Sequence, residues 1–136
     1  MIVLDSSFLI AYHNSRDAHH EAAAEIMARF LDGEWGRGLL LEYVFLEVAT
    51  VLMARRGPEV ASRVTDVLLG ARELEFVPCS DLFVDAVERF KLQTATRLSL
   101  VDVTIANVAI ERAGGLVATF DRELASVRGI QAIPEF

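Results

Sequence analysis

The sequence predicts an α/β protein: a three-layer, doubly wound sandwich whose short, mainly parallel sheet has five strands. One observation is that five short apolar runs alternate along the chain with longer segments that carry apolar residues at helical spacing. A second is that the first run, at residues 2–4, is apolar throughout, as expected for a strand buried on both faces. Short apolar strands that alternate with helices are typical of a parallel, doubly wound sheet.

The first strand ends directly at an acidic residue. Residues 2–4 are followed by Asp5, and Ser6 or Ser7 can cap a helix that starts near Phe8. Asp5 would then sit at the carboxyl end of a central strand, which is the edge of an open α/β sheet where ligands bind. A capping or turn role for Asp5 is the alternative. The choice between the two depends on whether other acids converge on the same edge.

The other elements of the N-terminal half are bounded by capping or helix-breaking residues. Asp17 is a plausible cap for the helix after it, and Gly33 ends that helix. Arg55 and Arg56 lie at the end of a very apolar helix, where cations suit the helix dipole. In order, we expect a helix over 18–32, a strand at 39–41, helices over 43–56 and 59–72, and a strand at 74–77.

In the C-terminal half, serines open two helices. Ser80 can cap the first and Ser99 the second, which Gly114 and Gly115 stop. Asp121 then follows an apolar strand directly, as Asp5 does. In order, we expect a helix over 81–93, a loop at 94–98, a helix from Ser99 to Ala113, a strand at 116–120, a helical turn and a strand at 130–133.

Length and composition indicate one domain in the cytoplasm. A chain of 136 residues without a linker-like stretch predicts a single domain spanning residues 1–136. We expect no contact with a membrane, because the most apolar stretch, Leu39 to Met53, contains two glutamates and is short for a spanning helix. The N-terminus lacks the basic region of a signal peptide. Cys79 is the only cysteine, so neither an internal disulfide nor a cysteine-based zinc site is expected.

The charge of the chain limits how it can meet nucleic acid. Its formal net charge is −7 and its pI about 4.9, which argues against general electrostatic binding to nucleic acid. A nuclease whose acids are concentrated in a metal site remains compatible with this charge.

Glu47 is the least expected residue, because it lies in a helix that is apolar nearly all round. A bare carboxylate buried there would cost several kcal/mol. We therefore expect it to meet an arginine, take up a proton or bind a metal ion. Glu42 lies about 140° away around the same helix and does not share its face.

Asp102 and Asp121 each have a capping and a functional interpretation. Ser99 and Asp102 have the spacing of a capping box, with Asp in place of Glu or Gln. Asp121 can cap the helical turn after it. Asp5 and Asp121 nevertheless follow two buried strands, and neighbouring strands would bring both carboxylates to one crevice. His13, His19 and His20 lack the spacing of zinc-binding helical pairs, so we expect no histidine metal site.

Four short motifs resemble those of a known family. They are V-L-D-S-S at 3–7, F-L-E-V at 45–48, S-L-V-D at 99–102 and A-T-F-D at 118–121. They resemble the four acidic motifs of the PIN-domain ribonucleases, and the chain most resembles the VapC-type toxins of bacterial and archaeal toxin–antitoxin pairs. The likeness covers nearly the whole chain, in the same order of elements. Glu42 and Leu124 depart from the family pattern without touching the four acids.

The resemblance implies strand order 3-2-1-4-5, endoribonuclease activity, a divalent cation, a homodimer and a VapB-type antitoxin that neutralises the toxin. Ligands that are all carboxylate oxygens suit Mg²⁺ or Mn²⁺ rather than zinc. We expect Asp5 and Asp102 to hold the main ion, and Glu47 and Asp121 to complete the site directly or through water. A water activated by the metal would then attack an RNA phosphodiester in line.

Three further residues are candidates for positioning substrate or water. Ser6 and Thr119 are hydroxyl neighbours of the acids. Arg97, just before the Asp102 helix, is a candidate phosphate contact, and a surface salt bridge is the alternative for it.

Two other functions are compatible with acids at strand ends. A phosphoacceptor receiver domain also gathers them around Mg²⁺, but it needs a lysine at a late strand end, and Lys91 lies within a predicted helix. A non-catalytic binding protein would use the acids only as caps and in salt bridges, and metal binding separates it from an enzyme.

Overall fold

The sheet of this protein consists of five parallel strands with β1 at its centre. The computed structural model describes residues 1–136. The strand order is β3-β2-β1-β4-β5, and all four pairs are parallel, which confirms the order 3-2-1-4-5. The strands are β1 (Ile2–Leu4), β2 (Gly38–Leu41), β3 (Leu74–Val77), β4 (Leu116–Ala118) and β5 (Gln131–Ile133).

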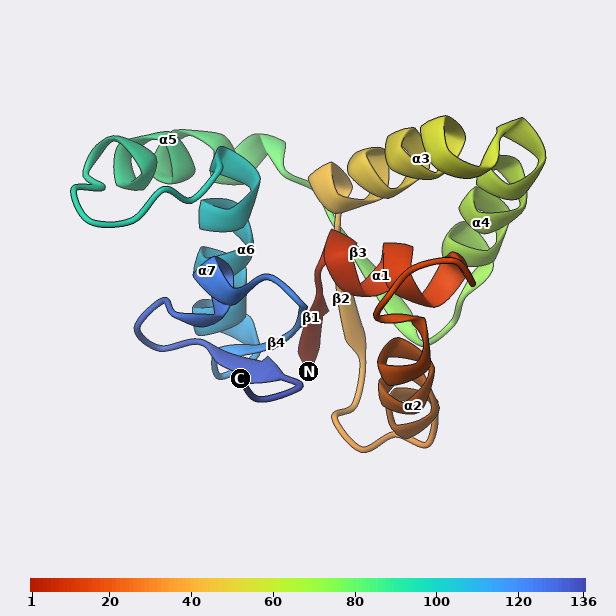
Figure 1. Cartoon of the computed structure of the whole chain (residues 1–136). Helices are drawn as coiled ribbons and strands as arrows, with labels where there is room; N and C mark the ends of the chain where they lie inside the picture. Colours follow the sequence, from red (N-terminus) through yellow and green to blue (C-terminus); the bar gives the residue numbers. More distant parts are fainter.

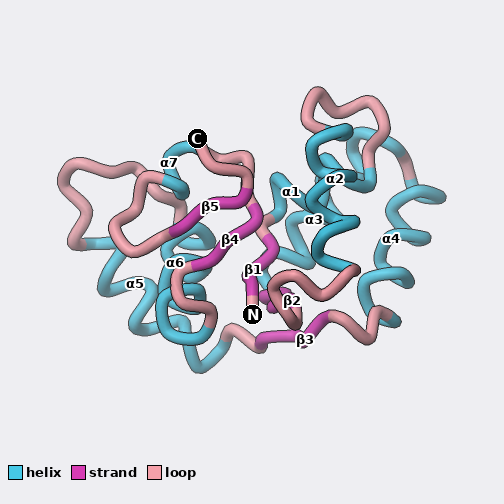
Figure 2. The backbone as a smooth tube through the Cα atoms, turned by 90° about the horizontal axis from the view of Figure 1, so that it is seen from below, coloured by secondary structure: helices cyan, strands magenta, loops and turns pink.

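Helices cover both faces of this sheet, as Figure 1 shows, and Figure 2 shows the strands from below, between the two helical layers. The helices α1–α4 lie on one side and α5–α7 on the other, because the connections from β1 through β3 run one way across the sheet and the later ones run back. The helices are α1 (Ser6–His13), α2 (His20–Leu31), α3 (Glu42–Arg56), α4 (Pro58–Gly70), α5 (Phe83–Lys91), α6 (Leu100–Arg112) and α7 (Arg122–Ala125), with a 3-10 turn at Ser80–Leu82 before α5.

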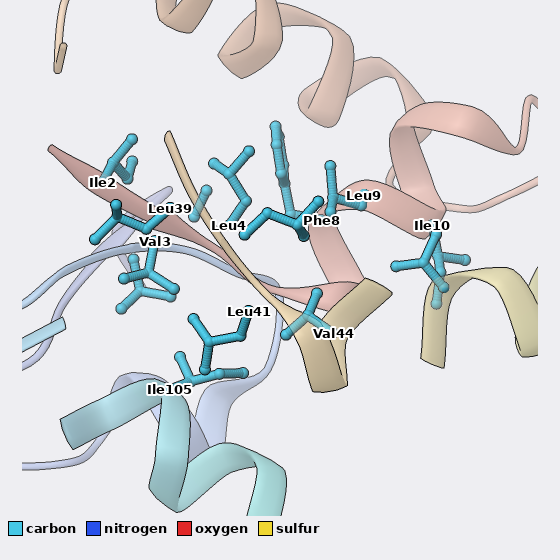
Figure 3. Close-up of a cluster of buried hydrophobic side chains, with 14 of the residues drawn as sticks. Ile2, Val3, Leu4, Phe8, Leu9, Ile10, Leu39, Leu41, Val44 and Ile105 are labelled. Atoms are coloured by element: carbon cyan, nitrogen blue, oxygen red, sulfur yellow. The ribbon is translucent and has the colours of Figure 1, made fainter. Parts of the chain in front are cut away.

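The core is built around β1. Every residue of this strand is at most 1% exposed. In Figure 3, Val3 points toward Ile105 of α6, while Ile2 and Leu4 point to the opposite side, where α1 contributes Phe8. Burial on both faces explains why the strand is a continuous apolar run. Since β1 is fixed by both helical layers, the residue that follows it has a defined position.

Several element ends differ from those expected. The first helix begins at Ser6 with Asp5 as its N-cap, not near Phe8 with a serine cap. Strand β4 ends at Ala118 rather than at residue 120. The Thr119 N–H still donates to the Ile133 carbonyl, but side-chain hydroxyls take the next two N–H groups: Ser7 accepts from Phe120, and Thr119 from Asp121. Both differences lie at the carboxyl edge of the sheet and have the same cause, hydroxyl groups that bond within a polar cluster.

One glycine allows the close approach of β4 and β5. Gly115 has a φ of +84°, and a Cβ atom there would lie 1.9 Å from the carbonyl oxygen of Gly129. Only glycine fits this position.

None of the helices combines the length and apolar character that a membrane span requires.

Candidate active site

Asp5 is the most deeply buried acid at the carboxyl edge of the sheet. It is 3% exposed, and its backbone N–H donates to the Ala118 carbonyl of β4 at 3.0 Å. Its Oδ2 accepts hydrogen bonds from the hydroxyls of Ser7 and Thr119, both at 2.7 Å. These bonds hold the carboxylate from two elements that are distant in sequence.

The two hydroxyls also tie the end of β1 to the loop between β4 and α7. Ser7 Oγ accepts from the Phe120 N–H at 2.9 Å, and Thr119 Oγ1 accepts from the Asp121 N–H at 3.0 Å. The sequence singled out Thr119 as a neighbour of the acids but considered Ser7 only as a helix cap. The signal was in the first motif, where a second hydroxyl residue stands two places after the acid.

Glu47 lies at the same site but is not buried, so the expectation of a buried carboxylate in an apolar helix was wrong. The residue is exposed, as are Leu46 and Met53 on the same helix. About half of the surface of Leu46 and of Met53 is therefore left uncovered by this chain. Glu47 has no arginine partner and instead accepts a hydrogen bond from the Ser6 hydroxyl, which also lies 3.4 Å from Asp5 Oδ1.

Asp102 and Asp121 both act as caps. Asp102 forms the capping box with Ser99: its Oδ2 accepts from the Ser99 N–H at 3.2 Å, and the Ser99 hydroxyl accepts from the Asp102 N–H at 3.0 Å. Asp121 Oδ1 accepts from the Glu123 N–H at 2.9 Å at the start of α7. These bonds use one oxygen of each carboxylate and leave the other free for a ligand.

The electrostatics show that the acids share one neighbourhood. Burial raises the pKa of the Asp102 carboxyl to about 6, and the charges of Asp5 and Asp121 push it in the same direction. Burial also raises the pKa of Asp5, and the charge of Glu47 adds to the rise, against hydrogen bonds that lower it. Carboxylates from the ends of β1 and β4, from the second turn of α3 and from the start of α6 therefore repel their neighbours.

A cavity of about 360 Å³ opens beside these acids. Glu47 and Asp121 line it, whereas Asp5 lies behind the lining residue Ser7. Its lining also includes Asp17, which the sequence identified only as a cap. The complete lining is Ser6, Ser7, Ile10, Asp17, His19, Glu47, Val51, Arg55, Phe120 and Asp121.

The structure does not bring Arg97 to this cavity. Arg97 is exposed in the loop before α6, and its backbone N–H donates to Glu123 Oε1 at 2.7 Å. Its guanidinium forms no salt bridge, so neither the phosphate contact nor the alternative finds support in the geometry.

The donor chemistry of the site fits a divalent cation. No three acidic, histidine or cysteine side chains are close enough to hold one ion as they stand. The available donors are nevertheless hard oxygens, which Mg²⁺ and Mn²⁺ prefer. A cation would also relieve the repulsion by Asp5 and Asp121 that adds to the burial-driven rise in the pKa of Asp102. Side chains that bind such an ion would have to draw together from their present positions.

The profile of the PIN domain family matches residues 2–130. This chain belongs to the PIN domain family. The resemblance carried by the four motifs is therefore confirmed, and with it the class of enzyme, a hydrolase acting on RNA that uses divalent metal. Among curated proteins, none matches the sequence significantly.

A solved structure establishes the fold independently. The crystal structure of Mycobacterium tuberculosis VapC20, a toxin described as cleaving the sarcin–ricin loop, superposes with a TM-score of 0.85. The match covers 96% of this chain and 97% of that chain, at 22% identity. The PIN order of strands also differs from the order 2-1-3-4-5 of receiver domains, which rules out the first alternative function.

Proposed function

We propose that this PIN domain, over residues 1–136, is a divalent-metal-dependent endoribonuclease and the toxin of a type II toxin–antitoxin pair. The observation that carries the proposal is the gathering of carboxylates at the carboxyl edge of the sheet in a member of a ribonuclease family. The similarity in fold to VapC20, a toxin that cleaves RNA, supports the biological role. Such a toxin would act in the cytoplasm.

In this proposal Asp5 and Asp102 hold the cation, and Glu47 and Asp121 complete its surroundings. When bound, the ion would supply an activated water and neutralise charge on the phosphate. The chain's own hydroxyls orient the acids: Ser7 and Thr119 fix the Asp5 carboxylate, and Ser6 holds that of Glu47. Because the Asp5 carboxylate is fixed before the ion binds, less ordering is needed when it does.

The cation is proposed to be Mg²⁺, with Mn²⁺ as the other candidate. Both ions prefer the oxygen donors that this site offers. Measuring cleavage rates with each ion, at matched free concentrations, decides between them.

The proposed partners are a VapB-type antitoxin and a second copy of the chain. Large apolar side chains are exposed on α2, α3 and α4, and burial of some of them against a partner would be favourable. These side chains are Leu31, Leu46, Met53, Val67 and Leu69. Co-expression with the adjacent gene should yield a complex, whereas a monomer that ignores that product would contradict this assignment.

The test of the activity is cleavage of a structured RNA by purified protein. We expect cleavage with Mg²⁺ or Mn²⁺, none in excess chelator, and a loss of roughly 10²-fold or more in Asp5→Asn and Asp121→Asn. Glu88→Gln, an exposed acid on α5, is the matched control and should cleave like the wild type. Cleavage that persists in chelator, or in Asp5→Asn, would overturn the proposal.

A further inference from the structure

Two aromatic rings stack on each other at the wall of the acidic cavity. The rings of His19 and Phe120 are parallel to within 7°, with centroids 4.5 Å apart. His19 precedes α2 and is exposed, while Phe120 lies half-buried between β4 and α7. Both residues line the cavity, so the pair presents aromatic surface to a molecule that enters it.

The hydrogen bonds of the site fix this pair relative to the acids. The Phe120 N–H donates to Ser7 Oγ, and the Ser7 hydroxyl in turn donates to Asp5 Oδ2. Phe120 is also the residue directly before Asp121. On the other side, the Asp17 carboxylate accepts from the His19 N–H at 2.8 Å. The stacked rings are therefore held beside the carboxylates by the same network that orients them.

An arginine lines the same cavity from another helix. Glu47, Val51 and Arg55 recur every four residues along α3 and share one face, and all three line the cavity. Arg55 lies eight positions after Glu47, which is about 12 Å along the helix axis. Arg55 forms no salt bridge within the chain, so its guanidinium is available to an anion.

Because the chain is acidic, it needs local contacts of this kind to bind RNA. With a net charge of −7, the protein gains little from general attraction to phosphates. Stacking of a base on an aromatic side chain contributes about 1–3 kcal/mol and requires only that the base be unpaired. A parallel aromatic pair next to acids that act on a phosphodiester has the chemistry to supply that contribution.

We propose that the His19–Phe120 pair is a nucleobase-binding subsite. An unpaired base of single-stranded RNA, adjacent to the phosphodiester at the acids, stacks on the pair, and Arg55 contacts a flanking phosphate. The proposal rests on the function proposed above and adds to it where the substrate must be single-stranded and which residues hold it.

The test measures RNA binding apart from cleavage. The probe is a single-stranded uridine 9-mer with one central 2-aminopurine, whose fluorescence is quenched on stacking, and its partner is the same 9-mer with an abasic centre. Binding is measured with Ca²⁺ in place of Mg²⁺, and the probe is checked for integrity afterwards. We expect His19→Ala and Phe120→Ala to weaken binding about 10-fold, within the range that one lost stacking contact gives.

Further variants separate stacking from a structural role. His19→Phe keeps a ring and should bind within about 3-fold of the wild type, as should Phe90→Ala, an exposed aromatic on α5 outside the cavity lining. The wild type should bind the abasic probe about 10-fold more weakly than the 2-aminopurine probe. His19→Ala should bind the two probes with equal affinity. Thermal melts verify that each variant is folded.

The outcomes distinguish the subsite from the enzymatic function. Suppose that the wild type cleaves RNA but the two alanine variants bind the 2-aminopurine probe as the wild type does. The subsite is then wrong and the function stands. The same holds if removing the base from the probe weakens binding by the alanine variants as much as binding by the wild type. If quenching depends on His19 while no RNA is cleaved, the subsite stands and the function is wrong. Wild-type protein that neither binds nor cleaves RNA overturns both.

Discussion

Replacing Thr119 with valine removes one hydroxyl from the centre of the site and keeps the shape of the side chain. Thr119 is fully buried, donates to Asp5 Oδ2 at 2.7 Å and accepts from the Asp121 N–H at 3.0 Å. A lost hydrogen bond to a charged group costs about 1.5–3 kcal/mol, and the unpartnered N–H adds to this, while the new methyl group returns about 0.8 kcal/mol. We expect Thr119→Val to lower the free energy of unfolding by roughly 2–3 kcal/mol.

The measurement is urea unfolding at pH 8 in excess chelator, followed by circular dichroism. The midpoint should fall with an unchanged slope, and the melting temperature should fall by roughly 6–12 °C. Thr119→Ser, which keeps the hydroxyl and loses one methyl group, is the control and should lose about 1 kcal/mol.

A double-mutant cycle with Asp5→Asn then tests the cause. Part of the Thr119→Val loss comes from the charge on its acceptor, so the loss should be smaller by about 1 kcal/mol in the Asp5→Asn background. A loss of under 1 kcal/mol in the wild-type background, or an equal loss in both backgrounds, would refute the hydrogen bond as the source of the stability.

Four other predictions concern charge and backbone. Asp5→Asn relieves repulsion, so in chelator it should melt at or above the wild-type temperature. In thermal scans with Mg²⁺, the stabilisation of this variant should be smaller than the roughly 2.7 kcal/mol that a cation at 100 times its dissociation constant adds to a folded protein. Burial raises the pKa of Asp102 to about 6, so its contribution to stability is lost as pH rises from about 4 to 6, and Asp102→Asn should remove that slope from a pH series of urea midpoints. Burial and the charge of Arg63 lower the pKa of His13 to about 4, so stability from neutral His13 is lost as pH falls from about 6.5 to 4. His13→Gln should therefore make the urea midpoint less dependent on pH in that range. Gly115→Ala should destabilise the protein by several kcal/mol, and a soluble variant with a wild-type melting temperature would contradict the close approach of Gly115 to Gly129.

The order of the elements was predictable because each strand is a short apolar run between clear helix boundaries. Burial of β1 on both faces follows directly from its composition. The positions of Asp5 and Asp121 at one edge were also predictable, since both follow parallel strands that turned out to be neighbours. The strand order came from the family resemblance, because the apolar runs do not say which strands pair.

The environment of Glu47 was not predictable from local pattern. An apolar helix face is equally suited to a core and to a partner, and the sequence of one chain does not distinguish them. The second role of Ser7 and the stacking of His19 on Phe120 depend on segments about 100 residues apart, which no spacing rule brings together. The sequence offered a capping and a functional interpretation for Asp102 and for Asp121. It did not show that each carboxylate can cap a helix with one oxygen and keep the other unbonded.

The position of β1 determines when the acidic cluster can form during synthesis. Asp5 leaves the ribosome before most of the residues that surround it, and the hydroxyl of Thr119 that orients it comes 114 residues later. At about 5–20 residues per second, that interval is roughly 6–23 s. Until β4 emerges, β1 also lacks one of its two neighbouring strands. A nascent chain therefore carries Asp5 through that interval without the rest of the site, and a chain that terminates within it never acquires the site.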